Sequence, residues 1–203
     1  MNTKTLTLII VFTALSAALS IYFPKIPAPY APFLYYQIWE IPIVAAFLSI
    51  GPKTGTAIAV LNTLILLVVF PGNLPTGPFY NLIAVLSMLL GIFAAYRIAV
   101  HGCPTENISH FLKEHGKALA VSTTALGVIT RVAITTTANY FLLAQPSPIG
   151  FGSFFEFGGV AGQQAVIAFL PFSVLFNATI ALYTIPVGLV IALTINRSFK
   201  FRK

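Results

Sequence analysis

Three polar side chains at helical spacing interrupt an apolar stretch of this chain. Residues 118–143 contain one charged side chain, Arg131, which lies near the middle of the stretch. Thr135 and Asn139 follow at i+4 and i+8, so a helix would place all three on one face. A charge at that depth in a membrane is costly and usually faces a protein interior or a cavity. The spacing therefore predicts a helix with an inward-facing polar stripe.

The other ionisable residues favour recognition over reaction. The chain has four acids, Glu40, Glu106, Glu114 and Glu156, and no two of them form an intramembrane pair. An aspartyl protease within the membrane needs two carboxylates, and a Ser/His hydrolase needs a His, which no apolar run provides. There is no phosphate-binding glycine loop, and the His spacing fits no standard metal site. We expect no enzyme activity, no cofactor and no metal.

Composition predicts a polytopic membrane protein, because 58% of the residues are hydrophobic and 7% are charged, against about 25% charged in soluble domains. At least four apolar runs suffice for spans of about 20 residues, and the second run is short. The predicted fold is all-α, a six-transmembrane-helix bundle in which residues 1–203 form a single integral membrane domain. The predicted spans are about 5–23, 37–50, 54–71, 79–100, 118–143 and 170–195.

The basic residues support six crossings. If both termini lie on one side, nine Lys and Arg residues share that side and Lys25 alone lies opposite. The positive-inside rule then places both termini in the cytoplasm. A five-span layout, or removal of residues 5–23 as part of a signal peptide, would destroy this asymmetry. The net charge of +7 therefore indicates contact with membrane lipid and no nucleic-acid partner.

The predicted outer side carries the candidate ligand contacts. Residues 22–34 contain four prolines, which exclude a regular helix and stiffen the loop. Nearby aromatic rings could anchor at the interface or form walls for a flat ligand, and amides would suit a neutral heterocycle. Pro171 fits the first turn of the last span, and Pro186 should kink it. The candidate substrate-binding residues are Tyr30, Phe33, Tyr35, Tyr36, Trp39, Glu40, Tyr80, Asn81, Asn139, Tyr140, Ser173 and Asn177.

Two further groups of residues have expected structural roles. Asn139 should lie about 12 Å outward of Arg131, so Asn139 is the better ligand contact. Arg131 and Thr135 would then organise the bundle from beneath the pocket, with Arg131 bonding exposed carbonyls or a polar neighbour such as Thr135. In the first span, Ala14 and Ala18 lie at i+4. Small residues permit close approach of another helix, either within the chain or from a partner subunit.

Four local motifs occur along residues 40–172. They are Glu40-Ile-Pro42 with Gly51-Pro52-Lys-Thr-Gly55; Gly77-Pro78-Phe-Tyr-Asn81-Leu-Ile-Ala84 running to Tyr96-Arg97; Arg131-Val with Thr136-Thr137-Ala-Asn139-Tyr140-Phe141; and Leu170-Pro171-Phe172. In this order and spacing they resemble the substrate-binding S component of an energy-coupling factor (ECF) transporter, in its riboflavin-specific branch. That branch often reads PFN..K at the sixth span, whereas this chain has Ser173 and Phe176 at those positions.

The resemblance implies a six-helix subunit of the cell membrane that binds a vitamin, riboflavin or a related flavin, from outside. It implies docking on an ECF transmembrane coupling subunit that carries two ATPase subunits, with Ala14 and Ala18 in the docking face. The first loop would cover the ligand, and Asn139 would hydrogen-bond it. Alternatives are an S component for another vitamin or small heterocycle, and a structural membrane protein that does not transport.

Overall fold

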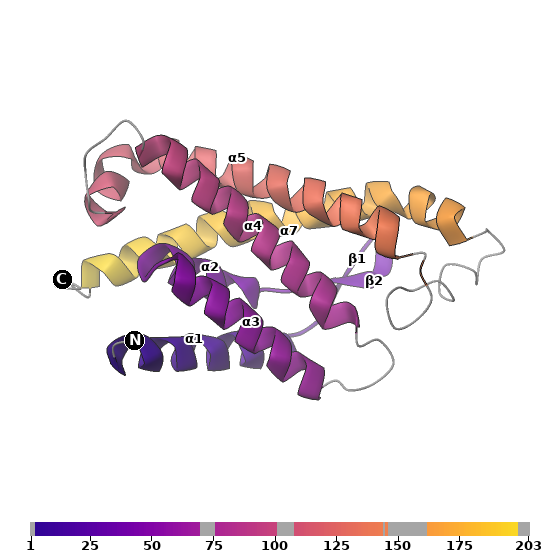
Figure 1. Ribbon diagram of the computed structural model, residues 1–203, viewed down its shortest axis with the longest axis horizontal. Helices are drawn as coiled ribbons and strands as arrows, with labels where there is room; N and C mark the ends of the chain where they lie inside the picture. The colour runs from indigo at the N-terminus through magenta and orange to yellow at the C-terminus, as the bar shows by residue number, and fades with distance from the viewer. Residues whose placement is uncertain (1–2, 70–75, 101–107, 144, 146–161, 199–203) are drawn as a thin grey trace.

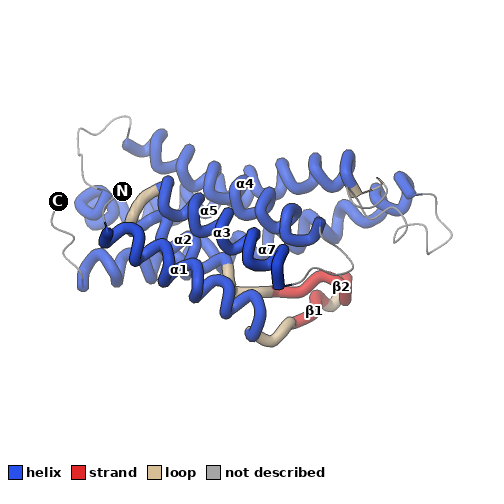
Figure 2. The backbone as a smooth tube through the Cα atoms, turned by 60° about the horizontal axis from the view of Figure 1, so that its bottom comes forward, coloured by secondary structure: helices blue, strands red, loops and turns tan. Residues whose placement is uncertain are grey.

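The computed structural model describes residues 3–69, 76–100, 108–143, 145 and 162–198. Its elements form an elongated helical bundle with two strands at one end (Figures 1 and 2). The strands pair antiparallel as a hairpin. In chain order the elements are α1 (Thr3–Tyr22), β1 (Ile26–Ala28), β2 (Ala31–Tyr36), α2 (Glu40–Ser49), α3 (Pro52–Val69), α4 (Thr76–Val100), α5 (Ile108–Leu142) and α7 (Gly162–Ser198).

Five helices, namely α1, α3, α4, α5 and α7, are long and apolar enough to cross a membrane. The sixth, α2, has ten residues, and Pro42 through Leu48 are all buried. A ten-residue helix rises about 15 Å, half the hydrocarbon core of a bilayer. Because α2 is enclosed by other helices, it does not need the length that contact with lipid requires. The predicted all-α, six-helix class is confirmed, with the short hairpin added.

Two predicted helix boundaries were wrong. Helix α5 begins at Ile108, well before the predicted start of the fifth span at about residue 118. Helix α7 begins at Gly162, so Pro171 lies within the helix and not in its first turn. Without an N–H, Pro171 cannot bond the carbonyl of Ile167 one turn earlier. Pro186 lies within α7, as expected.

The two ends of the bundle differ in charge. Helix α1 begins and α7 ends at the same end, opposite the hairpin (Figure 1). Lys4, Lys53, Arg97 and Lys117 lie at that end, near the starts of α1 and α3, the end of α4 and the start of the apolar part of α5. Lys25 lies just before β1, at the opposite end. This distribution is the predicted one, and the cytoplasmic position of the basic end stays a prediction.

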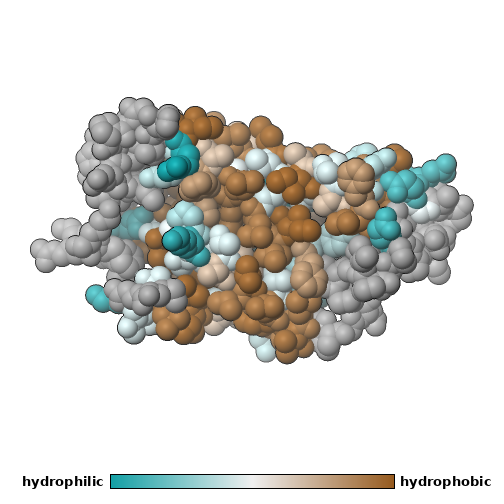
Figure 3. All heavy atoms as spheres, viewed as in Figure 1, coloured by the Kyte–Doolittle hydropathy of each residue, from teal (hydrophilic) through white to brown (hydrophobic). Residues whose placement is uncertain are grey.

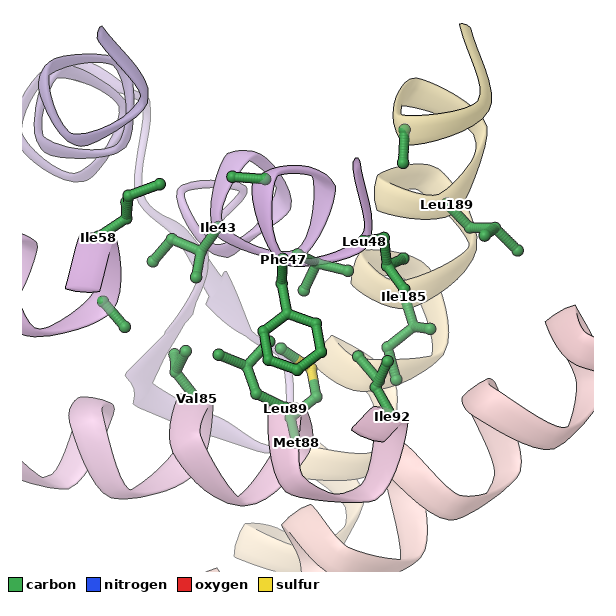
Figure 4. Packing of buried hydrophobic residues seen from close by; sticks show 14 of the residues in the cluster. Ile43, Phe47, Leu48, Ile58, Val85, Met88, Leu89, Ile92, Ile185 and Leu189 are labelled. Atoms are coloured by element: carbon green, nitrogen blue, oxygen red, sulfur yellow. The ribbon is translucent and has the colours of Figure 1, made fainter. Parts of the chain in front are cut away.

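The core surrounds α2. Its side chains Ile43, Phe47 and Leu48 pack against residues of α3, α4 and α7, among them Ile58, Met88 and Ile185 (Figure 4). Much of the outer face in Figure 3 is also apolar, and large hydrophobic side chains are exposed on every long helix. Apolar side chains both inside and outside are expected where the outer surface contacts lipid.

Glycines allow the helices to approach closely. A Cβ placed on Gly55 of α3 would lie 2.5 Å from the Phe47 Cβ, and one on Gly188 of α7 would lie 2.7 Å from a Val44 methyl. A Cβ on Gly91 of α4 would overlap the Thr130 hydroxyl and the Leu126 carbonyl of α5. The absence of a side chain at these positions therefore fixes the distances between helices.

We expect Gly91→Ala to destabilise the protein by about 1–3 kcal/mol, because the backbone of α5 must move to make room. Thermal unfolding of the detergent-solubilised protein measures this. The matched control is Gly116→Ala in α5, where an added Cβ meets nothing within 4 Å. That control should be neutral or stabilised by up to about 1 kcal/mol. Equal unfolding temperatures for the two variants would contradict the close packing of α4 on α5.

Candidate functional site

A cavity of about 360 Å³ lies between β2, the start of α2, α4, α5 and α7. This volume is in the range of small-molecule sites, which are mostly apolar with a few placed polar groups. The lining fits that description, since aromatic and aliphatic side chains surround a small polar set. The lining residues are Phe33, Leu34, Tyr35, Gln37, Trp39, Glu40, Gly77, Tyr80, Asn81, Ile83, Ala84, Arg131, Thr135, Ala138, Asn139, Leu143, Phe169, Ser173, Phe176, Asn177 and Ile180.

The hairpin is fixed to α7 by ring contacts. Centroid distances are 6.1 Å for Tyr30–Phe172, 5.5 Å for Phe33–Phe169 and 5.3 Å for Tyr36–Phe176. The Tyr183 hydroxyl also donates to the Gln37 carbonyl at 2.6 Å. Such ring pairs stabilise beyond the area they bury. The first loop is therefore a folded wall of the cavity.

Tyr30 and Tyr36 do not line the cavity, contrary to the predicted ligand contact. Their hydroxyl oxygens lie 2.6 Å apart and bond each other. Burial, together with this hydrogen bond, raises the pKa of the Tyr30 phenol above its usual range. The Tyr30–Tyr36 hydrogen bond therefore stabilises the hairpin.

A buried ion pair forms the inner wall. The Arg131 guanidinium bonds both carboxylate oxygens of Glu40, through Nη1 to Oε2 and through Nη2 to Oε1, the latter at 3.0 Å. The exposed fractions of the two residues are 2% and 4%. Arg131 Nε donates to the Asn177 Oδ1 at 3.0 Å. Glu40 is the first residue of α2, where the helix dipole favours a negative charge.

Arg131 bonds polar neighbours, Glu40 and Asn177, but Thr135 is not one of them. The Thr135 hydroxyl donates to the backbone carbonyl of Arg131 at 2.7 Å and does not contact the guanidinium. Sequence placed Glu40 near the outer end of a span and Arg131 at mid-depth. The two residues meet because α2 is short and buried, so its first residue lies at the depth of Arg131. Composition alone gives no signal for that depth.

Further along the cavity, Asn139 and Ser173 join α5 to α7. Asn139 Nδ2 donates to Ser173 Oγ at 2.5 Å, and Asn177 Nδ2 donates to the Ser173 carbonyl at 3.0 Å. The Ser173 hydroxyl proton and the Asn139 Oδ1 have no partner among the described groups. One donor and one acceptor are therefore available to a ligand. Arg131, Thr135 and Asn139 all line the cavity, as the predicted stripe requires.

The structure brings most of the predicted ligand contacts together around the cavity. Tyr140 is 40% exposed and packs edge-on against Phe141, because it lies about 100° around α5 from Asn139. The prediction from sequence missed Phe169, Phe176 and Ile180, which also line the cavity. These residues share a face of α7 with Ser173, so they could have been found from the helical spacing. The predicted residues that line the cavity are Phe33, Tyr35, Trp39, Glu40, Tyr80, Asn81, Asn139, Ser173 and Asn177. Their part in binding stays a prediction.

This architecture is that of a known class of membrane protein. The chain superposes on a solved structure described as the S component of a bacterial ECF transporter, with a TM-score of 0.67, 21% sequence identity and 100% of both chains covered. It is also similar in sequence to the riboflavin transporter RibU of Staphylococcus aureus (strain TCH60), with 26% identity over 179 residues, 86% of this chain and 84% of that protein. No protein-family model matches the chain.

Both comparisons confirm the resemblance predicted from the four motifs. With five helices of spanning length and hydropathy, they also confirm a multi-pass protein of the cell membrane. The matches extend beyond the motifs, since the superposition includes the entire chain.

The ion pair predicts strong coupling between Glu40 and Arg131. Arg131→Met should cost about 3–5 kcal/mol, because it leaves the Glu40 carboxylate buried and unpaired, and Glu40→Gln should cost a similar amount. The double variant should lose much less than the sum, since it leaves no unpaired charge. Denaturant unfolding in detergent measures all three. Additive losses would show that the two charges do not interact.

Proposed function

We propose that this protein is the vitamin-binding S component of an ECF-type uptake transporter, and that its ligand is riboflavin or a related flavin. The observation that carries the proposal is the cavity lined by aromatic rings and amides, within a fold of this class. The similarity to a riboflavin transporter supports the ligand.

The lining suits a flat heterocycle. Trp39, Tyr80 and Phe176 offer ring surfaces, and apolar side chains such as Ile180 complete the walls. The Asn139 carbonyl oxygen and the Ser173 hydroxyl can bond a ring edge that presents a donor beside an acceptor. Among the lining residues the one acid, Glu40, is neutralised by Arg131. This arrangement favours binding over catalysis, and we propose that the protein is not an enzyme.

Phe176 supports an aromatic ligand despite the departure from the riboflavin pattern at this position. Its ring stacks on Tyr36 and lines the cavity, so it adds a flat wall where that branch has a cation. An S component for another heterocycle is the alternative with the same geometry. Mass spectrometry of ligand extracted from the purified protein separates the two.

The proposed function requires a partner subunit. Ala14 and Ala18 are exposed on α1 and do not line the cavity. Small exposed residues one turn apart allow a second helix to pack closely. We propose that this face docks on the coupling subunit, which carries two ATPase subunits. The basic end of the bundle would then face the cytoplasm.

We expect the purified protein to bind riboflavin, seen as quenching of flavin fluorescence in a titration. Asn139→Ala and Ser173→Ala should each weaken binding by about tenfold or more, because each removes one hydrogen bond made by a buried side chain. Thr137→Ala is the control, since Thr137 is exposed on α5 and bonds its own helix. Absence of riboflavin binding by the unmodified protein would exclude this ligand.

For docking, Ala14→Leu and Ala18→Leu should reduce co-purification with the coupling subunit and leave riboflavin affinity unchanged. The added side chain would hold the two helices apart. Ala125→Leu is the matched control, because Ala125 is an exposed alanine on α5. Equal recovery of the complex with all three variants would rule out α1 as the docking face.

A further inference from the structure

The charge balance of the cavity indicates what net charge its ligand can carry. The charged side chains among the lining residues are Glu40 and Arg131, and they neutralise each other. The remaining polar lining groups are amides and hydroxyls. The inner wall therefore has no net charge to offer to a ligand.

The hydrogen bonds of Arg131 leave little capacity for an anion. A guanidinium has five N–H donors. Nε bonds Asn177, Nη1 bonds Glu40 and approaches the Met88 sulfur at 3.6 Å, and Nη2 bonds Glu40. One Nη2 proton has no acceptor among the described residues. A single N–H can meet a neutral carbonyl, whereas a carboxylate or phosphate is best bound by two parallel donors.

We propose that Glu40 is a specificity-determining residue that masks Arg131, so that the inner wall selects uncharged ligands and rejects anionic ones. This inference rests on the proposed function. An anion that enters the cavity loses its hydration and gains no unpaired cation in return. The anion would also be repelled by the Glu40 carboxylate, which lines the same wall.

Removal of the Glu40 charge should convert the same wall into an anion site. With Glu40→Gln the guanidinium keeps its position through Asn177 but has no countercharge. Arginine recognises carboxylate and phosphate through its planar fork. The proposal therefore predicts a gain of binding for anionic ligands, which a merely structural role of Glu40 would not produce.

The test compares dissociation constants for riboflavin and two anionic flavins, one phosphorylated on the side chain and one carboxylated on the ring. The first ligand carries its charge on the side chain and the second carries it on the ring, so the test covers either orientation of the flavin in the cavity. We expect the unmodified protein to bind at least one of them about tenfold or more weakly than riboflavin. In Glu40→Gln the affinity ratio for that same ligand should shift by about tenfold or more toward the anion. Glu40→Asp, which keeps the charge, should preserve the original ratio.

The outcomes separate this inference from the proposed function. If the unmodified protein does not bind riboflavin, the proposed function fails. If it binds riboflavin and both anionic flavins equally well, masking by Glu40 is wrong. An unchanged ratio in a folded Glu40→Gln variant also overturns the inference. If that variant does not fold, the affinity ratios of the unmodified protein are compared with those of Glu40→Gln/Arg131→Met. The double variant has no guanidinium in the wall and should still reject the anion.

Discussion

The buried pair of Glu40 and Arg131 is the constraint on which the arrangement of the bundle depends. Each charge alone would be strongly destabilising in a low-dielectric interior, so each requires the other with good geometry. Arg131 lies near the middle of the apolar part of α5, and Glu40 begins α2. Asn177 on α7 accepts a hydrogen bond from the Nε of the same guanidinium. Three helices far apart in sequence are thereby fixed at one depth. Helices α2 and α5 cannot slide past each other without separating the two charges, and α7 cannot slide without losing the hydrogen bond between Asn177 and Arg131.

The short length of α2 follows from the same constraint and creates the space for the cavity. The helix begins at the depth of Arg131 and has only ten residues, ending at Ser49. Gly55 and Gly188 allow α3 and α7 to pack tightly against it. Among the described residues, the element that leads into α2 is the hairpin and not a helix. The hairpin, with Gln37 and Trp39, lies before the start of α2 and forms one wall of the cavity, opposite α4, α5 and α7.

The features that could be predicted from sequence are those that a single segment determines. Apolar length gave the spans, helical spacing placed Arg131, Thr135 and Asn139 on one face, and the aromatic residues near the first loop indicated a ligand wall. The features that could not be predicted depend on contacts between segments. The depth of Glu40 is set by helices packed around α2, and the Tyr30–Tyr36 hydrogen bond is set by hairpin register. Pro171 was misplaced because a long apolar helix tolerates proline once its neighbours satisfy the freed carbonyl.

The cavity and the small-residue face of α1 lie on different parts of the bundle, and α2 connects them. None of the lining residues belongs to α1 or α3. Helix α2 contributes Glu40 to the cavity, and it also packs against α1, α3 and α7. Protein interiors are close-packed, so a displacement of one end of a buried helix is transmitted to its neighbours. A ligand in contact with Glu40 therefore acts on an element that touches α1 directly. The ion pair thus belongs both to the cavity wall and to the helix that packs against α1.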